Sequence, residues 1–224
     1  MKRGVCVFLM LNLWLLSVTN VQAMQFLKNE KIGSIYFANS GEGVGGFCCE
    51  NAVSNTGVYY TAHNKKNTSS YGKGVALFGA GEVLLNVHYD VYYGKRFTVV
   101  IGNDDKSSFG NITMQIDQAD IYSISNDSEN KIYVVYNRKN QKGSDYAIFA
   151  GSKSRIVSEV VNTAELSQRF LHGDIAEYGR LEMQDNKLYI PYIVKKDGKL
   201  RRKGKFKLTW QEDGFCFDIE KVLR

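Results

Sequence analysis

The sequence predicts an all-β fold, mainly antiparallel and sandwich or barrel-like, with one short helix near residues 164–171. The chain of 224 residues contains 14 Tyr, 12 Phe and 21 Gly but a single Pro, a composition that favours strands and turns over helices. Short runs of strand-forming residues follow one another along the chain, with turn residues between them. Hydrophobic residues make up 44% of the sequence, so we do not expect a disordered chain.

Strands are predicted in order from the amino end. The alternation of side chains is clearest within Glu82–Tyr93, where Leu85 and Val87 fall on one face and Asn86 and His88 on the other, as in a half-buried strand. The predicted strands are Ile32–Asn39, Gly57–His63, Gly74–Phe78, Glu82–Tyr93, Arg96–Gly102, Asn111–Asp117, Asp120–Ser125, Lys131–Arg138, Tyr146–Ala150, Arg155–Val161, Leu181–Gln184, Lys187–Lys195, Lys205–Gln211 and Phe215–Ile219. Pro191 lacks an N–H group and therefore predicts that its strand lies at a sheet edge.

The helix is predicted at Ala164–Leu171. Thr163 is the expected N-cap, Glu165 lies in the first turn, and Leu166 and Phe170 are four residues apart on one face. We interpret this helix as a packing element.

Residues 1–23 have the features of a cleavable signal peptide. Lys2 and Arg3 precede the apolar stretch Val5–Val18, and Val21-Gln22-Ala23 predicts cleavage before Met24. An uncleaved transmembrane anchor is the alternative, but a bilayer span needs about 20 apolar residues, and the stretch Val5–Val18 is shorter than that. We therefore expect a single mature domain, residues 24–224, without a transmembrane segment, exported to the periplasm or secreted. Its 27 basic and 23 acidic residues leave a net charge of +4, too small to imply nucleic acid.

The mature chain retains three cysteines: Cys48, Cys49 and Cys216. In an oxidising compartment we expect Cys216 to form a disulfide with Cys49 or with its neighbour Cys48, and we take Cys49 as the partner. Only one of the two neighbours can pair, because adjacent residues of a strand point to opposite faces. Three buried free thiols are the alternative, and a nucleophilic cysteine is a third interpretation.

The segment Lys195–Lys207 carries eight cations and one acid, with Asp197-Gly198 as the expected hairpin turn. A projecting basic hairpin is typical of a surface that binds an acidic protein or an anionic envelope component. A solvated hairpin whose lysines prevent edge-to-edge pairing is the alternative. The predicted binding residues are Lys195, Lys196, Lys199, Arg201, Arg202, Lys203 and Lys205.

Other motifs are weak. The glycine-rich segment Gly41–Gly46 is followed by no helical pattern and no Lys-Ser/Thr, so it predicts a β-turn loop instead of a nucleotide site. The histidines lack metal-ligand spacing, and we expect no cofactor, metal or nucleic acid. The leading hypothesis is an exported, non-enzymatic domain that binds another macromolecule, such as an immunity or inhibitor protein. The alternatives are a cell-wall hydrolase that uses His63, His88, Asp90 or Cys49, and an envelope structural subunit.

Overall fold

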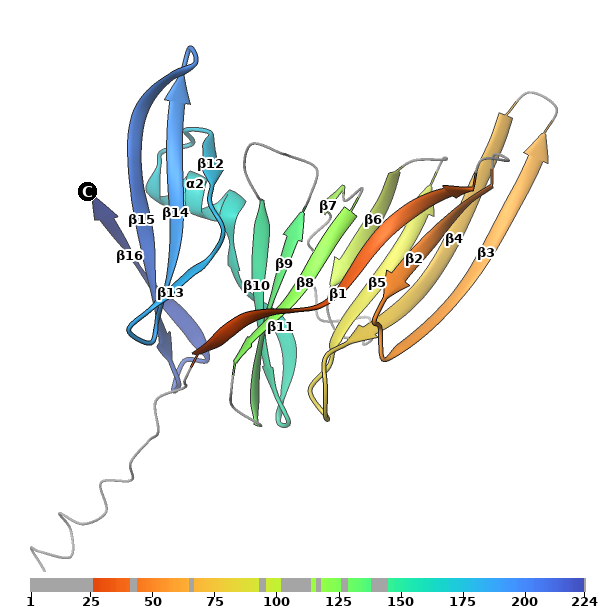
Figure 1. Ribbon diagram of the computed structural model, residues 1–224, viewed down its shortest axis with the longest axis horizontal. Coiled ribbons are helices and arrows are strands. Elements are labelled where there is room, and N and C mark those ends of the chain that lie inside the picture. The colour runs from red at the N-terminus through yellow and green to blue at the C-terminus, as the bar shows by residue number, and fades with distance from the viewer. Residues whose placement is uncertain are drawn as a thin grey trace, which may run out of the picture.

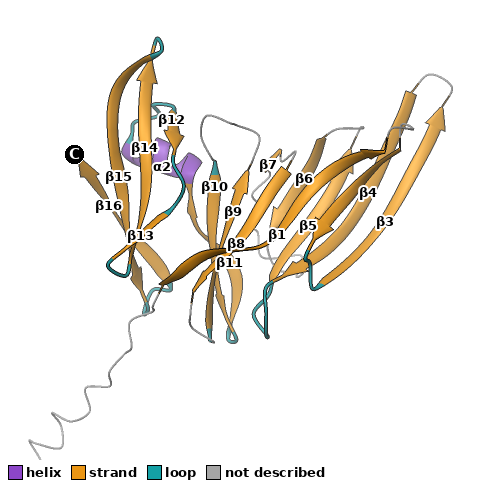
Figure 2. Ribbon diagram, in the orientation of Figure 1, coloured by secondary structure: helices purple, strands orange, loops and turns teal. Residues whose placement is uncertain are grey.

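The computed structural model describes residues 26–40, 44–64, 67–92, 96–101, 114–115, 118–125, 129–137 and 145–223. Within these ranges the chain forms three antiparallel sheets and a single short helix, which confirms the predicted all-β class (Figures 1 and 2). The predicted signal peptide, residues 1–23, lies outside the described residues, so its cleavage stays a prediction.

The middle layer is a six-stranded sheet, here called sheet A (Figure 1). Its strands run in the order β11-β10-β9-β8-β1-β2. They are β1 (Phe26–Ser40), β2 (Val44–Glu50), β8 (Gln118–Ser125), β9 (Asn130–Asn137), β10 (Tyr146–Ser152) and β11 (Arg155–Asn162). Both faces of this sheet are covered: Tyr133 and Val135 of β9 belong to one core, and Ile132 and Val134 to the other. The continuous apolar runs of β9 and β10 follow from this double burial.

Sheet B packs on the first face of sheet A. Its strands run in the order β3-β4-β5-β6-β7. They are β3 (Ser54–Asn64), β4 (Asn67–Phe78), β5 (Leu85–Tyr92), β6 (Arg96–Ile101) and β7 (Met114–Gln115). Phe78 and Leu85 share a core with Ile35 and Phe149 of sheet A. Leu85 and Val87 are buried and Asn86 is only partly so, which agrees with the predicted alternation in β5.

Sheet C and the helix cover the second face of sheet A. Its strands are β12 (Ala176–Tyr178), β13 (Glu182–Gln184), β14 (Lys187–Lys196), β15 (Lys199–Gln211) and β16 (Cys216–Leu223), with β14 next to both β12 and β13. Leu188 and Phe206 pack with Ile148 of sheet A and Leu166 of the helix in one core. Alternate residues of β14 and β15 are therefore buried, and the others form the outer face of sheet C.

The helix, α2 (Thr163–Phe170), begins one residue earlier than predicted and has a different cap. The Asn162 side chain accepts a hydrogen bond from the Ala164 N–H at 2.9 Å, so Asn162 is the N-cap and the assignment of Thr163 is wrong. The Thr163 hydroxyl is buried and instead donates to the Tyr146 carbonyl and accepts from the Tyr146 N–H. The Thr163 side chain therefore bonds to the backbone of the neighbouring strand β10 and does not cap the helix, although the local sequence pattern predicts that it does.

The prediction that Pro191 lies in an edge strand is also wrong. β14 pairs with β15 on one side and with β12 and β13 on the other. Pro191 lies opposite the interruption between Tyr178, where β12 ends, and Glu182, where β13 begins. Across this gap the Gly179 N–H donates to the Pro191 carbonyl at 2.8 Å. An interior strand tolerates proline here because no regular ladder bond is required of its nitrogen.

The predicted Cys49–Cys216 disulfide is not formed. Cys48, Cys49 and Cys216 are free thiols. Cys49 lies in β2 of sheet A and packs against the core that sheets A and B share, whereas Cys216 is exposed at the start of β16 in sheet C. The two strands belong to different layers. The side chains of Cys48 and Cys49 do point to opposite faces of β2, as expected. Cys49 pairs in register with Ile35 of the core, whereas Cys48 pairs with Tyr36.

Candidate functional site

The basic segment forms the β14–β15 hairpin, whose end projects beyond α2 and β12 (Figure 1). Asp197 and Gly198 have φ angles of 53° and 74°, and Lys196 pairs with Lys199 across them. Positive φ at both central residues matches the right-handed twist of a two-residue hairpin, which Asp-Gly supplies. The predicted turn is therefore confirmed, and β15 begins at Lys199 instead of Lys205.

Three lysines of sheet C that lie away from the turn are paired with acids of neighbouring strands. Lys195 contacts both oxygens of Glu177 in β12 at 2.8 and 3.1 Å, and Lys205 contacts Glu182 in β13. Lys207 contacts Glu220 in β16 at 2.8 Å, which raises the pKa of the lysine and lowers the pKa of the glutamate. Two of the seven predicted binding residues, Lys195 and Lys205, therefore have their charge balanced within the sheet.

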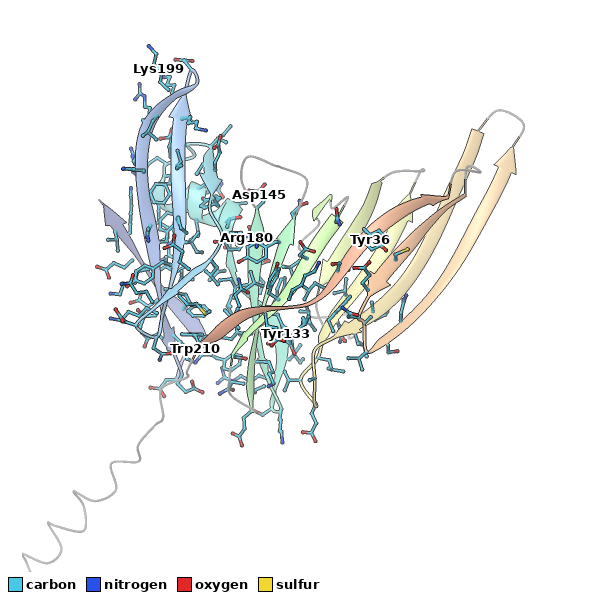
Figure 3. The ribbon with its side chains drawn as sticks, viewed as in Figure 1. Tyr36, Tyr133, Asp145, Arg180, Lys199 and Trp210 are labelled. Carbon is cyan, nitrogen blue, oxygen red and sulfur yellow. The ribbon has the colours of Figure 1, made fainter. Side chains whose placement is uncertain are left out.

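The remaining predicted cations gather at the hairpin end, which we call the tip and define as residues 196–203. In the part of the chain that the structure describes, none of these cations takes part in an ion pair. They are Lys196, Lys199, Arg201, Arg202 and Lys203. With Asp197 as the only acid, five positive charges and one negative charge leave a net charge of +4. Figure 3 shows Lys199 at the extreme end of the hairpin.

The cations of the tip lie on both faces of the ribbon. Lys203 pairs with the exposed Ile193 on the outer face, and Arg202 pairs with the buried Val194 on the inner face. The ladder is irregular between Val194 and Lys195, where Arg201 is the extra residue. Burial raises the pKa of Tyr192, and the positive charge of the Arg202 guanidinium acts in the opposite direction and lowers it. The tip thus presents positive charge in several directions.

Three exposed aliphatic side chains accompany these charges. Ile175 is 88% exposed, Leu200 58% and Ile193 39%. Leu200 pairs with Lys195, and Ile175 directly precedes Ala176, which pairs with Val194, so all three lie at the same end of sheet C. The other large hydrophobic residues with high exposure in the described ranges, Val53 and Ile156, lie next to or within strands of sheets B and A. Single exposed residues are ordinary, but a group of three is informative.

Of the residues considered for hydrolysis, the described backbone keeps the two histidines of sheet B, His63 and His88, far apart. His63 pairs with Thr68 of β4, and His88 pairs with Val75 of the same strand. Thr68 and Val75 are seven positions apart along β4, roughly 23 Å at about 3.3 Å per residue, so the backbone positions of His63 and His88 are distant from each other. The side chains of His63, His88 and Asp90 lie outside the described residues. The Cys49 thiol is half-buried, and burial together with the neighbouring Cys48 raises its pKa to about 12, which opposes a nucleophilic role.

Sequence reasoning missed a group of tyrosines in the core between sheets A and C. Tyr136 accepts hydrogen bonds from Asn29 and from the Leu181 N–H, and the Tyr178 and Ser167 hydroxyls lie 2.6 Å apart. Tyr146 and Tyr192 are buried, and in the described structure their hydroxyls have no hydrogen-bond partner. Burial raises the pKa of Tyr146 well above its usual range. No sequence spacing identifies this group, because its members come from different sheets.

The glycine-rich segment is placed only in part. Gly41, Glu42 and Gly43 lie outside the described residues, and Val44–Glu50 continues as strand β2. The segment therefore leads into a strand and not into the helix that a phosphate site requires. Among the residues described, no group of three or more His, Cys, Asp or Glu residues is positioned for a metal ion, and no helix has the length and apolar character needed to cross a bilayer.

Comparison with known proteins returns no family model, no curated protein and no solved structure that matches this chain.

Proposed function

We propose that the mature chain is a non-enzymatic binding protein that docks onto a negatively charged partner surface through the tip of its β14–β15 hairpin. The observation that carries this proposal is the division of charge along one hairpin. Lys195, Lys205 and Lys207 of sheet C have acidic partners, whereas the tip, residues 196–203, keeps a net charge of +4. Clustered charge without internal partners attracts oppositely charged surfaces and raises the rate of association.

The exposed aliphatic residues support the same proposal. Ile175, Ile193 and Leu200 lie beside the cations, so docking would remove apolar surface from water in addition to bringing opposite charges together. A hairpin that served only to keep sheet edges apart would have no need of them, because lysines alone achieve that.

The test measures how purified 24–224 sediments with fragments of its own cell envelope. Lys199→Glu with Arg201→Glu is the test variant, because both side chains are exposed and lie away from the core. Lys153→Glu with Lys187→Glu is the matched control, since these exposed residues lie in the β10–β11 turn and at the far end of β14. We expect the wild type and the control to bind and the tip variant to lose binding. Equal binding of the tip variant would remove the hairpin from the proposal.

A further inference from the structure

We infer that the partner surface is an anionic phospholipid bilayer, and that the hairpin tip enters its head-group region end-on. This inference rests on the proposed function and names the partner class of the same site. It is carried by three properties of the tip: the distribution of its charges, the kind of apolar residues it exposes, and the balance of charge along the rest of the hairpin.

The first property is that cations lie on both faces of the ribbon. Lys203 and the exposed Ile193 share the outer face, while Arg202 lies on the inner face opposite Val194. A protein that packs against one face of the hairpin would leave the cations of the other face in water. A flat layer of phosphates that the ribbon meets end-on contacts both sets, so the arrangement favours a planar anionic surface.

The second property is the chemistry of the exposed apolar residues. All three are aliphatic, and they come from three segments: Ile175 from the loop before β12, Ile193 from β14 and Leu200 from β15. Protein interfaces are energetically dominated by Trp, Tyr and Arg in buried pockets, and Leu is under-represented there. Apolar side chains such as Leu beside Lys and Arg are found in segments that lie at the boundary between head groups and acyl chains.

The third property is that the uncompensated charge of the hairpin is concentrated at the tip. Glu177, Glu182 and Glu220 form ion pairs with three lysines farther along the sheet, so a bilayer meets positive charge at the tip and a more balanced surface behind it. Three of the five cations at the tip are lysines. An ammonium group is a compact point charge with rotatable donors, so it can meet anionic head groups without a fixed orientation.

The experiment measures partition of purified 24–224 into vesicles of phosphatidylcholine with about 30 mol% phosphatidylglycerol and into vesicles of phosphatidylcholine alone. We expect binding to the anionic vesicles only, weakened by salt because screening shortens the reach of the charges. Lys199→Glu with Arg201→Glu should lower the partition coefficient at least about twentyfold, since each cation near the surface contributes about fivefold. The control Lys153→Glu with Lys187→Glu, with the same net charge as the tip variant, should stay within about twofold of the wild type.

A second arm tests the apolar contact. Ile175→Ser with Leu200→Ser should lower the partition coefficient about tenfold while the dependence on salt remains. Leu200→Trp should show a blue shift of its fluorescence on anionic vesicles, against the constant background of Trp210, which lies toward the other end of β15 (Figure 3). An unshifted spectrum, or equal loss of binding in the tip and control variants, would overturn the inference.

Different results would contradict the proposed function and the bilayer inference. If envelope fragments bind the wild type but not the tip variant, and vesicles bind neither, the hairpin is a docking site for another component, such as an acidic protein, and the bilayer inference is wrong. Protease treatment of the envelope fragments separates these cases: binding that survives treatment supports the bilayer, and binding that is lost contradicts it. If envelope fragments bind the tip variant as well as the wild type, the proposed function itself fails.

Discussion

The attachment of sheet B to sheet A depends on a close approach that a double-mutant cycle can measure. The Tyr133 hydroxyl of β9 donates to the Val83 carbonyl at 2.5 Å in a buried setting, and Val83 lies in the segment that joins β4 to β5. Gly79 of the same segment has a φ of 121°, and a Cβ atom built on it would collide with the Tyr133 hydroxyl. The hydroxyl therefore both holds the segment and excludes a side chain from it.

The magnitudes follow from these contacts. Tyr133→Phe leaves the buried Val83 carbonyl without its donor, and we expect the free energy of unfolding to fall by about 1–3 kcal/mol. Gly79→Ala forces a side chain into an unfavourable φ, which costs about 1–3 kcal/mol, and adds the clash with the hydroxyl. In the Tyr133→Phe background that oxygen is gone, and the nearest ring atoms lie 3.1 and 3.2 Å from the added Cβ. The cost of Gly79→Ala should then be lower by about 1–2 kcal/mol.

The assay is urea unfolding of residues 24–224, followed by fluorescence for the wild type, both single variants and the double variant. Burial raises the pKa of Tyr133 to about 12, so the hydroxyl remains a donor and the coupling should be unchanged between about pH 5 and pH 9. Additive effects, within about 0.5 kcal/mol, would refute the argument that Gly79 is required by the Tyr133 hydroxyl.

Three further predictions concern single groups. Burial raises the pKa of Glu159 from 4.5 to about 7, so the folded state binds its proton more tightly and stability should fall as pH rises from about 4.5 to 7. After discounting for its partial exposure, Glu159→Gln should raise the free energy of unfolding by about 1 kcal/mol at about pH 8 and not at about pH 4, measured by urea midpoints. Asn162→Ala should lower the free energy of unfolding by about 1 kcal/mol through loss of the helix cap; an unchanged urea midpoint would assign the cap elsewhere. In a thiol-labelling time course at about pH 8, the exposed Cys216 should react at least about a hundredfold faster than Cys49, because the raised pKa of Cys49 keeps its thiol protonated. Equal labelling rates would contradict the half-buried environment of Cys49.

The strands that sequence reasoning missed have identifiable causes. β2 contains two adjacent glycines, Gly45 and Gly46, which weaken its strand propensity. It forms because it pairs with β1 at seven positions. β12 has three residues and is stabilised by its pairing with β14 and by the buried Tyr178. In both cases the partner strand supplies the hydrogen bonds and the packing that local propensity does not.

The candidate site, too, could be predicted from the sequence only in part. Its location in a basic hairpin with an Asp197-Gly198 turn could be predicted, because the turn depends on residues adjacent in sequence. Which lysines remain unpaired could not, since Glu177, Glu182 and Glu220 come from three other strands. The contribution of Ile175 was equally hidden, because only the pairing of Ala176 with Val194 brings its loop to the hairpin.

By itself, the sequence determined the properties that depend on neighbours within a few residues: the β class, a helix near residues 164–171, the hairpin turn and the alternation of Cys48 and Cys49. Tertiary structure decided the rest. It buried both faces of sheet A, placed Pro191 opposite a gap inside a sheet, kept Cys49 and Cys216 in separate layers, and concentrated the unpaired charge of the hairpin at its tip. The physical reason is that hydrogen-bond partners, ion pairs and buried contacts are set by strands distant in sequence, whose register no local pattern encodes.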